Sequence, residues 1–367
     1  MRKFGYYTMD DAGNRVTEYA KGDTIPTHLP DYFIGLTSTW ELDVWGRLRT
    51  LRQSALSNYL AGREGRNFVV SNLVSEIATA YYTLLAFDNE LAIILQTIGK
   101  QQESLEVVKI QKEAGRANEL AVKQFEAQLT QSKIFEQEIR QKITETENRI
   151  NLLIGRYPQP IARQRDNLYT GLPAMYSAGV PSQLLAYRPD VRESSYRLMA
   201  TRFELGSARA SFLPSFNITA QLGYQALAAR FLFSTPRSIM YNVLGGMVAP
   251  VINRRAIQAQ FSSAKANQLS AMYAYQKTIL NGYVEVVNEL SGIDRLQEIS
   301  ALKKKQNELL LRSVEAATEL YRTAKASYLE VLIVQQQSLQ TQLEMVEVGR
   351  RQKIASISLY KALGGGW

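Results

Sequence analysis

The chain has 367 residues, a formal net charge of +9, one histidine and no cysteine. The lack of cysteine excludes disulfides, thiolate metal sites and a thiol nucleophile. The positive charge does not indicate nucleic acid, because the basic residues are spread along helical patterns and interleaved with Glu and Gln, as between Lys100 and Lys123. We expect solvated helix faces and no nucleic-acid partner.

The N-terminal residues have no apolar signal-peptide core, and the chain has no run of about 20 apolar residues. No membrane-spanning helix is therefore expected. The histidine, His28, stands in a loop-like stretch and is expected to be solvated.

Apolar and polar residues alternate in a segment that predicts a strand over 33–45. Its two faces differ in polarity, as a half-buried soluble sheet or a membrane strand requires. The apolar face carries Ile34, Leu36, Trp40, Leu42 and Val44, and the polar face carries Thr37, Thr39, Glu41 and Asp43.

A proline-free stretch from Pro30 to Pro158 predicts a long helical hairpin over 46–157. Gly115 can end the first helix, which places the tip near 115–121. Apolar residues recur every 3.5 positions, which predicts a left-handed coiled coil. The seam consists of Leu84, Phe87, Leu91, Ile94, Ile98, Gln101, Leu105 and Val108.

Prolines return in the next segment, so residues 158–187 are expected to form an irregular connection and 188–211 a helix. Pro189 suits the first helical position, and Asp190 places negative charge at the helix N-terminus. We interpret Arg188-Pro189-Asp190 as a helix cap and not as a catalytic dyad.

A second alternating segment predicts a hairpin of two strands over 212–252. Three such strands beside long coiled helices favour a membrane β-barrel. So few strands cannot close a barrel alone, so other copies of the chain must complete it. The apolar face includes Phe216, Ile218 and Leu222, and the polar face includes Asn217, Thr219 and Gln221. Residues 239–252 alternate less cleanly, because Leu244 and Val248 fall on the polar face.

A second long hairpin is predicted over 253–367, with its tip near 324–330 and Ser327 as a possible N-cap. It matches the first hairpin at a nearly constant offset. Asp43–Arg47 aligns with Pro250–Arg254, and Gly115 aligns with Ala324. The chain is therefore an internal duplication.

Catalytic machinery is not expected. No glycine loop opens a helix after a strand, and paired carboxylates such as Glu136 and Glu138 lie on solvated helix faces. A Ser-His-Asp arrangement would need His28, which has no nucleophile motif to serve. We predict no enzyme activity, no catalytic residues, no metal site and no cofactor.

Four motifs, in this order, resemble the outer-membrane factor family, the TolC-like exit ducts of bacterial efflux systems, and in particular its lipoprotein-like drug and metal efflux branch. They are Trp40–Arg47, Leu184–Val191, Ala208–Pro214 and Tyr360–Trp367. The resemblance covers about Phe33 to Trp367. It implies a mainly α protein with a membrane β part: a homotrimer in which an α-helical barrel is joined to a shared transmembrane β-barrel.

The resemblance also implies four strands per protomer, a place in the outer membrane with a long periplasmic extension, and two partners, a periplasmic adaptor and an inner-membrane pump. Residues 1–32 would then be an extracellular loop. The family's signal peptide, first strand and leading helices have no match here, so we expect an N-terminally truncated chain. A structural coiled-coil scaffold with an appended β module is the alternative.

Two sets of site residues follow. On the strands, Trp40, Leu42, Phe216, Ile218 and Leu222 are expected to face lipid, and Thr39, Glu41, Asp43, Asn217, Thr219 and Gln221 to face the lumen. The tips are expected to dock the adaptor and form a gate, through Gly115, Glu119, Leu120, Ala324, Ser327, Tyr328, Leu329 and Glu330. The first tip departs from the family pattern, since Ala121 stands where an acid is usual.

Overall fold

The computed structural model describes residues 6–9, 15–18, 30–164, 168, 187–250, 252–323 and 325–366. The chain forms two compact units. The first consists of Met1–Ser54 and Arg202–Asn267, and the second of Ala55–Thr201 and Gln268–Trp367. The unit boundaries fall inside long helices, so they cut across the hairpins expected from the sequence.

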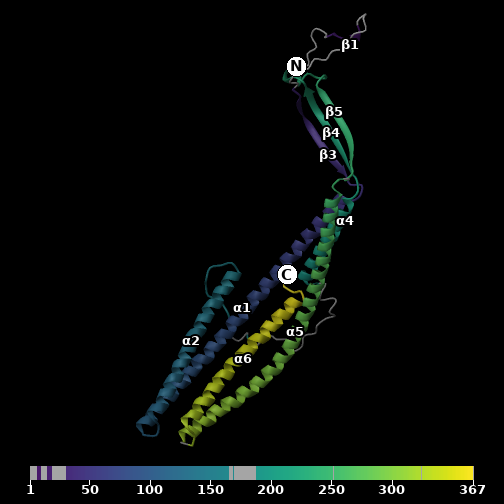
Figure 1. Ribbon diagram of the computed structural model, residues 1–367. Helices are drawn as coiled ribbons and strands as arrows, with labels where there is room; N and C mark the ends of the chain where they lie inside the picture. The colour runs from purple at the N-terminus through teal and green to yellow at the C-terminus, as the bar shows by residue number, and fades with distance from the viewer. Residues whose placement is uncertain are drawn as a thin grey trace. The chain divides into compact units, whose positions relative to one another are not determined.

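The first unit contains a three-stranded antiparallel sheet in the order β3-β4-β5 (Figure 1). Its strands are β3 (Tyr32–Leu42), β4 (Ser215–Ala226) and β5 (Ile239–Val248). A 3-10 turn, η2 (Ala229–Phe231), lies in the connection between β4 and β5. The alternation of aromatic, β-branched and polar residues suits strands with two different faces.

Two further strands lie in the segment expected to be a loop. β1 (Tyr6–Met9) pairs antiparallel with β2 (Arg15–Glu18). Both segments are rich in aromatic and β-branched residues, which favour extended backbone. Residues 1–5, 10–14 and 19–29, including His28, lie outside the described residues.

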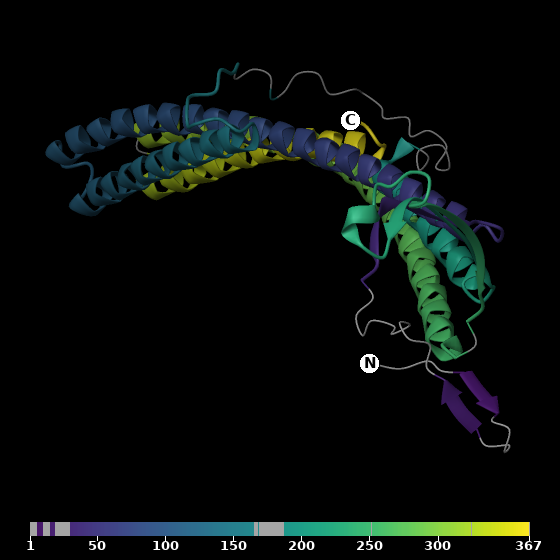
Figure 2. The same ribbon diagram turned by 90° about the horizontal axis from the view of Figure 1, so that it is seen from above.

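The helices form two hairpins (Figures 1 and 2). α1 (Arg47–Glu113) is followed by α2 (Glu119–Leu153), and α5 (Arg254–Arg322) by α6 (Tyr328–Ala362). α4 (Pro189–Ala210) precedes the β4–β5 hairpin. Residues 158–164 have no helix or strand, while 165–167 and 169–186 lie outside the described residues.

The predicted coiled-coil seam lies in the core of the second unit. Its apolar residues pack against α2 at Val122, Phe125, Leu129 and Ile139, and α6 adds Leu332. Gln101 is also buried, and its side-chain amide has no hydrogen-bond partner among the described residues. The buried members of the α1 seam in this cluster are Leu91, Ile94, Ile98, Leu105 and Val108.

The duplication is visible in the helix ends. At the first tip the amide of Arg116 donates to the carbonyl of Gln111, and at the second tip Lys325 donates to Leu320, both at 2.8 Å. Asn118 and Ser327 then cap α2 and α6 with their side-chain oxygens. Each pair of equivalent residues differs by 209 positions, as a duplicated hairpin requires.

Candidate channel surfaces

The strand register places the predicted lipid-facing residues on one face of the sheet. In antiparallel pairing, directly opposed residues point to the same side. Trp40 is opposite Ile218, Leu42 is opposite Phe216, and Leu36 is opposite Leu222. Three of them are unusually exposed for large apolar groups: 79% of Leu36, 63% of Trp40 and 60% of Leu222 are accessible. Such a face needs an apolar partner or lipid.

The other face of β3 and β4 is polar. Thr39 is opposite Thr219, Glu41 is opposite Asn217, and Thr37 is opposite Gln221. β5 continues the apolar face cleanly, with Met247 opposite Phe216 and Tyr241 opposite Leu222. On the polar side it contributes Leu244 opposite Thr219 and Val248 opposite Ser215, so the irregularity seen in the sequence persists in the sheet.

Two acids assigned to the lumen face also contact the start of α1: Glu41, which lies on the polar face of β3, and Asp43. β3 ends at Leu42, so Asp43 lies beyond the strand, and its carboxylate accepts the amides of Leu48 at 2.9 Å and Arg49 at 2.8 Å. Glu41 forms a two-pronged pair with Arg47, both Nη2–Oε distances being 2.8 Å. Asp43 satisfies orphan helix donors, and the strand therefore ends before the predicted residue 45.

The first tip turns at Gly115, whose φ of +65° favours glycine. Glu119 begins α2 and is paired with Lys112 and, at 3.8 Å, with Lys123. The hydrogen bond from Lys112 lowers the pKa of the Glu119 carboxyl. Leu120 is 57% exposed at this tip. The carboxylate of Glu119 at the first tip thus has two lysine partners.

The second tip carries its acid differently. Glu330 is exposed, and within the described ranges it has no salt bridge. Ser327 Oγ accepts the amide of Leu329, whose side chain is 50% exposed. Ala324 lies outside the described residues.

The two tips pack together. Tyr321 and Tyr328 of the second hairpin are packed against the cluster that contains Ala121, Val122 and Phe125 of the first. This shared core places the two tips side by side.

Sequence reasoning missed the long-range role of Arg188. Asp190 lies in the first turn of α4, as expected, and its carboxylate accepts the amide of Val191 at 2.9 Å. Arg188, however, is buried and donates to the carbonyl of Ala362 at the end of α6 at 2.8 Å. It also pairs with Asp190 at 2.8 Å and with Glu285 of α5 at 2.9 Å. No local pattern in the sequence indicates these partners, because Ala362 lies 174 positions from Arg188.

Within the described ranges, no group of three His, Asp or Glu side chains could hold a metal ion.

α1 does contain an 18-residue stretch that could cross a membrane by length and composition, contrary to expectation. A helix whose seam packs in a core passes the same test, so this is weak support for a spanning helix.

Comparison with known sequences gives relatives along nearly the whole chain. The cation efflux system protein CusC of Escherichia coli O6:H1 is 29% identical over 350 residues, which are 95% of this chain and 75% of CusC. The outer membrane protein OprJ of Pseudomonas aeruginosa is 30% identical over 366 residues, which are 97% of this chain and 72% of OprJ.

Solved structures share the fold. A crystal structure of CusC superposes with a TM-score of 0.83 at 28% identity, covering 100% of this chain and 82% of CusC. The outer-membrane channel OprN superposes with a TM-score of 0.86 at 23% identity, covering 100% of this chain and 80% of OprN. The second likeness concerns the fold alone.

The sequence model of the family described as outer membrane efflux protein matches residues 14–156 and 180–365. These ranges include β3, both helical hairpins and the β4–β5 hairpin. With two-faced strands feeding duplicated coiled-coil hairpins, the chain belongs to the outer membrane efflux protein family.

Proposed function

We propose that three copies of the chain form the outer-membrane exit duct of a tripartite efflux system, which conducts small molecules or ions passively from the periplasm to the exterior. The observation that carries this proposal is the sheet register. It gathers exposed apolar residues on one face and hydroxyl and amide residues on the other. A barrel wall between lipid and water has this pattern.

The proposed trimer follows from the sheet edges. β3 and β5 are the outer strands of the sheet, and each pairs on one side only within the described residues. An unpaired edge is not tolerated in lipid, so strands of other copies must complete the ring. The resemblance implies four strands per protomer, which together make one closed barrel.

A coiled-coil scaffold explains the hairpins less completely. A scaffold does not explain a sheet with exposed large apolar side chains, and in this sheet Leu36 is 79% and Tyr241 81% accessible. It also gives no reason for strands to lead into the first helix of each hairpin, as β3 leads into α1 and β5 into α5. A duct uses both features, because the barrel and the helical tunnel must be continuous.

Cargo selection belongs to the partners of the duct rather than to its wall. Relatives of similar identity are named for cation efflux, pyoverdine export and toluene efflux. One duct architecture therefore serves ionic and apolar cargo. We infer that a periplasmic adaptor and an inner-membrane pump open this duct and choose what enters it.

Cell fractionation tests the proposed function. We expect the protein in the outer-membrane fraction, running on a gel as an oligomer unless the sample is boiled. Recovery in the soluble fraction as a heat-insensitive monomer would instead support the scaffold.

We further propose that the second tip forms part of a periplasmic gate. On a threefold axis, three copies of Glu330 would approach one another at the constriction. An acidic ring favours cations, and like-charge repulsion loosens it. The plainer interpretation is a solvated acid in the first turn of α6, which the helix dipole favours.

Glu330→Gln distinguishes the two interpretations. We expect lower cation selectivity and a lower resting conductance in a planar bilayer, because the ring loses its charge and its repulsion. Glu138→Gln, an exposed acid far along α2, is the matched control and should change neither quantity. If Glu330→Gln behaves like this control, no such gate exists.

A further inference from the structure

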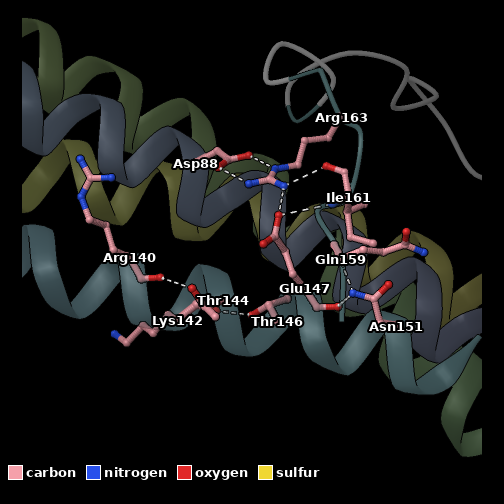
Figure 3. A network of polar contacts seen from close by, with 10 residues as sticks. All are labelled: Asp88, Arg140, Lys142, Thr144, Thr146, Glu147, Asn151, Gln159, Ile161 and Arg163. Carbon is pink, nitrogen blue, oxygen red and sulfur yellow. Dashed lines mark hydrogen bonds and ion pairs between the residues drawn. The ribbon is translucent and has the colours of Figure 1, made fainter. Parts of the chain in front are cut away.

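The chain leaves α2 and folds back over the helices as a short segment, here called the strap, which consists of residues 156–164 and Leu168. Its first contacts are to the end of α2. Asn151 donates from Nδ2 to the carbonyl of Gln159 at 2.8 Å, and Arg156 Nε donates to Asn151 Oδ1 at 2.7 Å. Figure 3 shows Gln159 and Asn151 at this turn.

The centre of the strap is fastened by one guanidinium. Arg163 donates to the carboxylate of Asp88 on α1, with an Nη2–Oδ1 distance of 3.0 Å, and to the carboxylate of Glu147 on α2 (Figure 3). Its Nη1 also donates to the carbonyl of Ile161 at 2.9 Å. Only 6% of the Asp88 side chain and 17% of the Arg163 side chain are exposed. The guanidinium therefore bridges two helices from a third segment.

Apolar contacts flank this ion cluster on both sides. Ile161 packs against Ala80 and Leu84 of α1 and Ile150 of α2. Leu168 is fully buried, in one cluster with Leu85 and Ala86 of α1 and Val346 of α6. The strap thus reaches from the first hairpin to a helix of the second.

The duplication supplies an internal comparison for the ion cluster. Leu84 and Ile150 of the first hairpin correspond to Ile293 and Leu359 of the second at an offset of 209, and all four are buried. The same offset places Gln297 opposite Asp88 and Ser356 opposite Glu147.

The second hairpin therefore lacks both acids at the equivalent positions. It is joined there by an apolar cluster that contains Ile293, Leu296, Ala355 and Leu359. Hydrophobic residues often replace a buried ion cluster without loss of stability. The acids of the first hairpin are therefore not needed to join two helices of this kind. What these two acids share is their contact with Arg163, which belongs to the strap.

We propose that the strap is a clasp that fastens α6 of the second hairpin to α1 of the first, and that Arg163 is the positioning residue that seats it between Asp88 and Glu147. Through α6 the clasp acts on the second tip, so its role in the duct rests on the proposed function. Without Arg163, the two carboxylates would face each other across α1 and α2 with no cation between them. The strap would then lose its polar anchor, and Leu168 would leave its buried position in the cluster with Leu85 and Val346.

The test uses the absence of cysteine in this chain. A single Leu168→Cys substitution in the outer-membrane protein reports on the seat, because a buried thiol reacts slowly with a bulky maleimide. We expect Leu168→Cys alone to be protected. Adding Arg163→Met should speed labelling at least about ten-fold, since removing one partner of a buried ion cluster is strongly destabilising.

Controls separate the clasp from general stability. Arg149→Met breaks an exposed 2.8 Å pair with Glu76 between the same two helices and should leave labelling unchanged. Arg163→Lys should give an intermediate rate, because an ammonium cannot reproduce the fork of a guanidinium. If Arg163→Met does not accumulate, Asp88→Asn with Glu147→Gln removes the anchor from the other side and should also expose the reporter thiol.

The result that overturns the clasp is equal protection of the Leu168→Cys thiol with and without the Arg163 anchor. The unboiled oligomer and its outer-membrane location are measured on the same samples. A protein that never appears as an outer-membrane oligomer contradicts the proposed duct. An intact oligomer with unchanged labelling contradicts the clasp alone.

Discussion

Replacing Ile218 by arginine should abolish assembly in the outer membrane, whereas the same change at the adjacent Thr219 should be tolerated. Ile218 lies in the central strand of the sheet, opposite Trp40 on β3 and Gly245 on β5. If this face meets lipid, a charge near the midplane costs about 2–4 kcal/mol in each copy. A trimer incurs this cost three times.

Thr219 is the matched position because it shares the strand, the depth and the backbone pairing of Ile218. It lies opposite Thr39 and Leu244 on the other face. An arginine there would extend into a water-filled lumen, where its charge stays hydrated. The measurement is the amount of heat-modifiable oligomer in outer-membrane fractions. Equal accumulation of both variants would contradict the assignment of the faces.

The sequence predicted the sheet faces and the coiled-coil core well, because both depend on local periodicity. A period of two assigns Ile218 and Trp40 to one face whatever their partners are. A period of 3.5 likewise identifies Leu84 and Ile94 as core. Both patterns are repeated over many residues, so a single exception such as Leu244 or Gln101 does not hide them.

The end of β3 was misplaced because two local signals compete there. The alternation continues through Val44, which favours a strand, but Asp43 stands where a helix N-terminus needs an acceptor. In the structure the amides of Leu48 and Arg49 donate to the Asp43 carboxylate. The available signal was Asp43 itself, a possible capping acid that stands before Gly46 and a long helix.

The ion clusters could not be predicted, because their members are far apart in sequence. Arg163 reaches Asp88 across 75 positions, and Arg188 reaches Ala362 across 174. No periodicity links such residues. Their partners become known only when the hairpins are packed.

The second large effect is expected at Arg188. Arg188→Met removes the donor to the Ala362 carbonyl and leaves Asp190 and Glu285 without their cation. Breaking a buried pair typically costs about 3–5 kcal/mol. Because 34% of the Glu285 side chain is exposed, water can compensate in part, and we expect the lower end of that range, about 3 kcal/mol.

The measurement is thermal dissociation of the purified oligomer, compared with Arg197→Met. Arg197 is on α4, the helix that starts directly after Arg188, and pairs with Glu193. Because 67% of its side chain is exposed, its loss should cost less than about 1 kcal/mol. A shift no larger than that of Arg197→Met would show that Arg188 acts only as part of a local cap.

A substitution that leaves the charges intact tests the same junction independently. Gly364 follows α6 with a φ of +87°, and a Cβ there would lie 2.9 Å from the carbonyl carbon of Tyr187. Gly364→Ala should therefore push the end of α6 away from Arg188 and lower the dissociation temperature as well. Because both changes act on one contact, their combined effect should be smaller than the sum of the two. Full additivity would instead mean that Arg188 and Gly364 stabilise the helices separately, and that the end of α6 is not held at the start of α4 by this arginine.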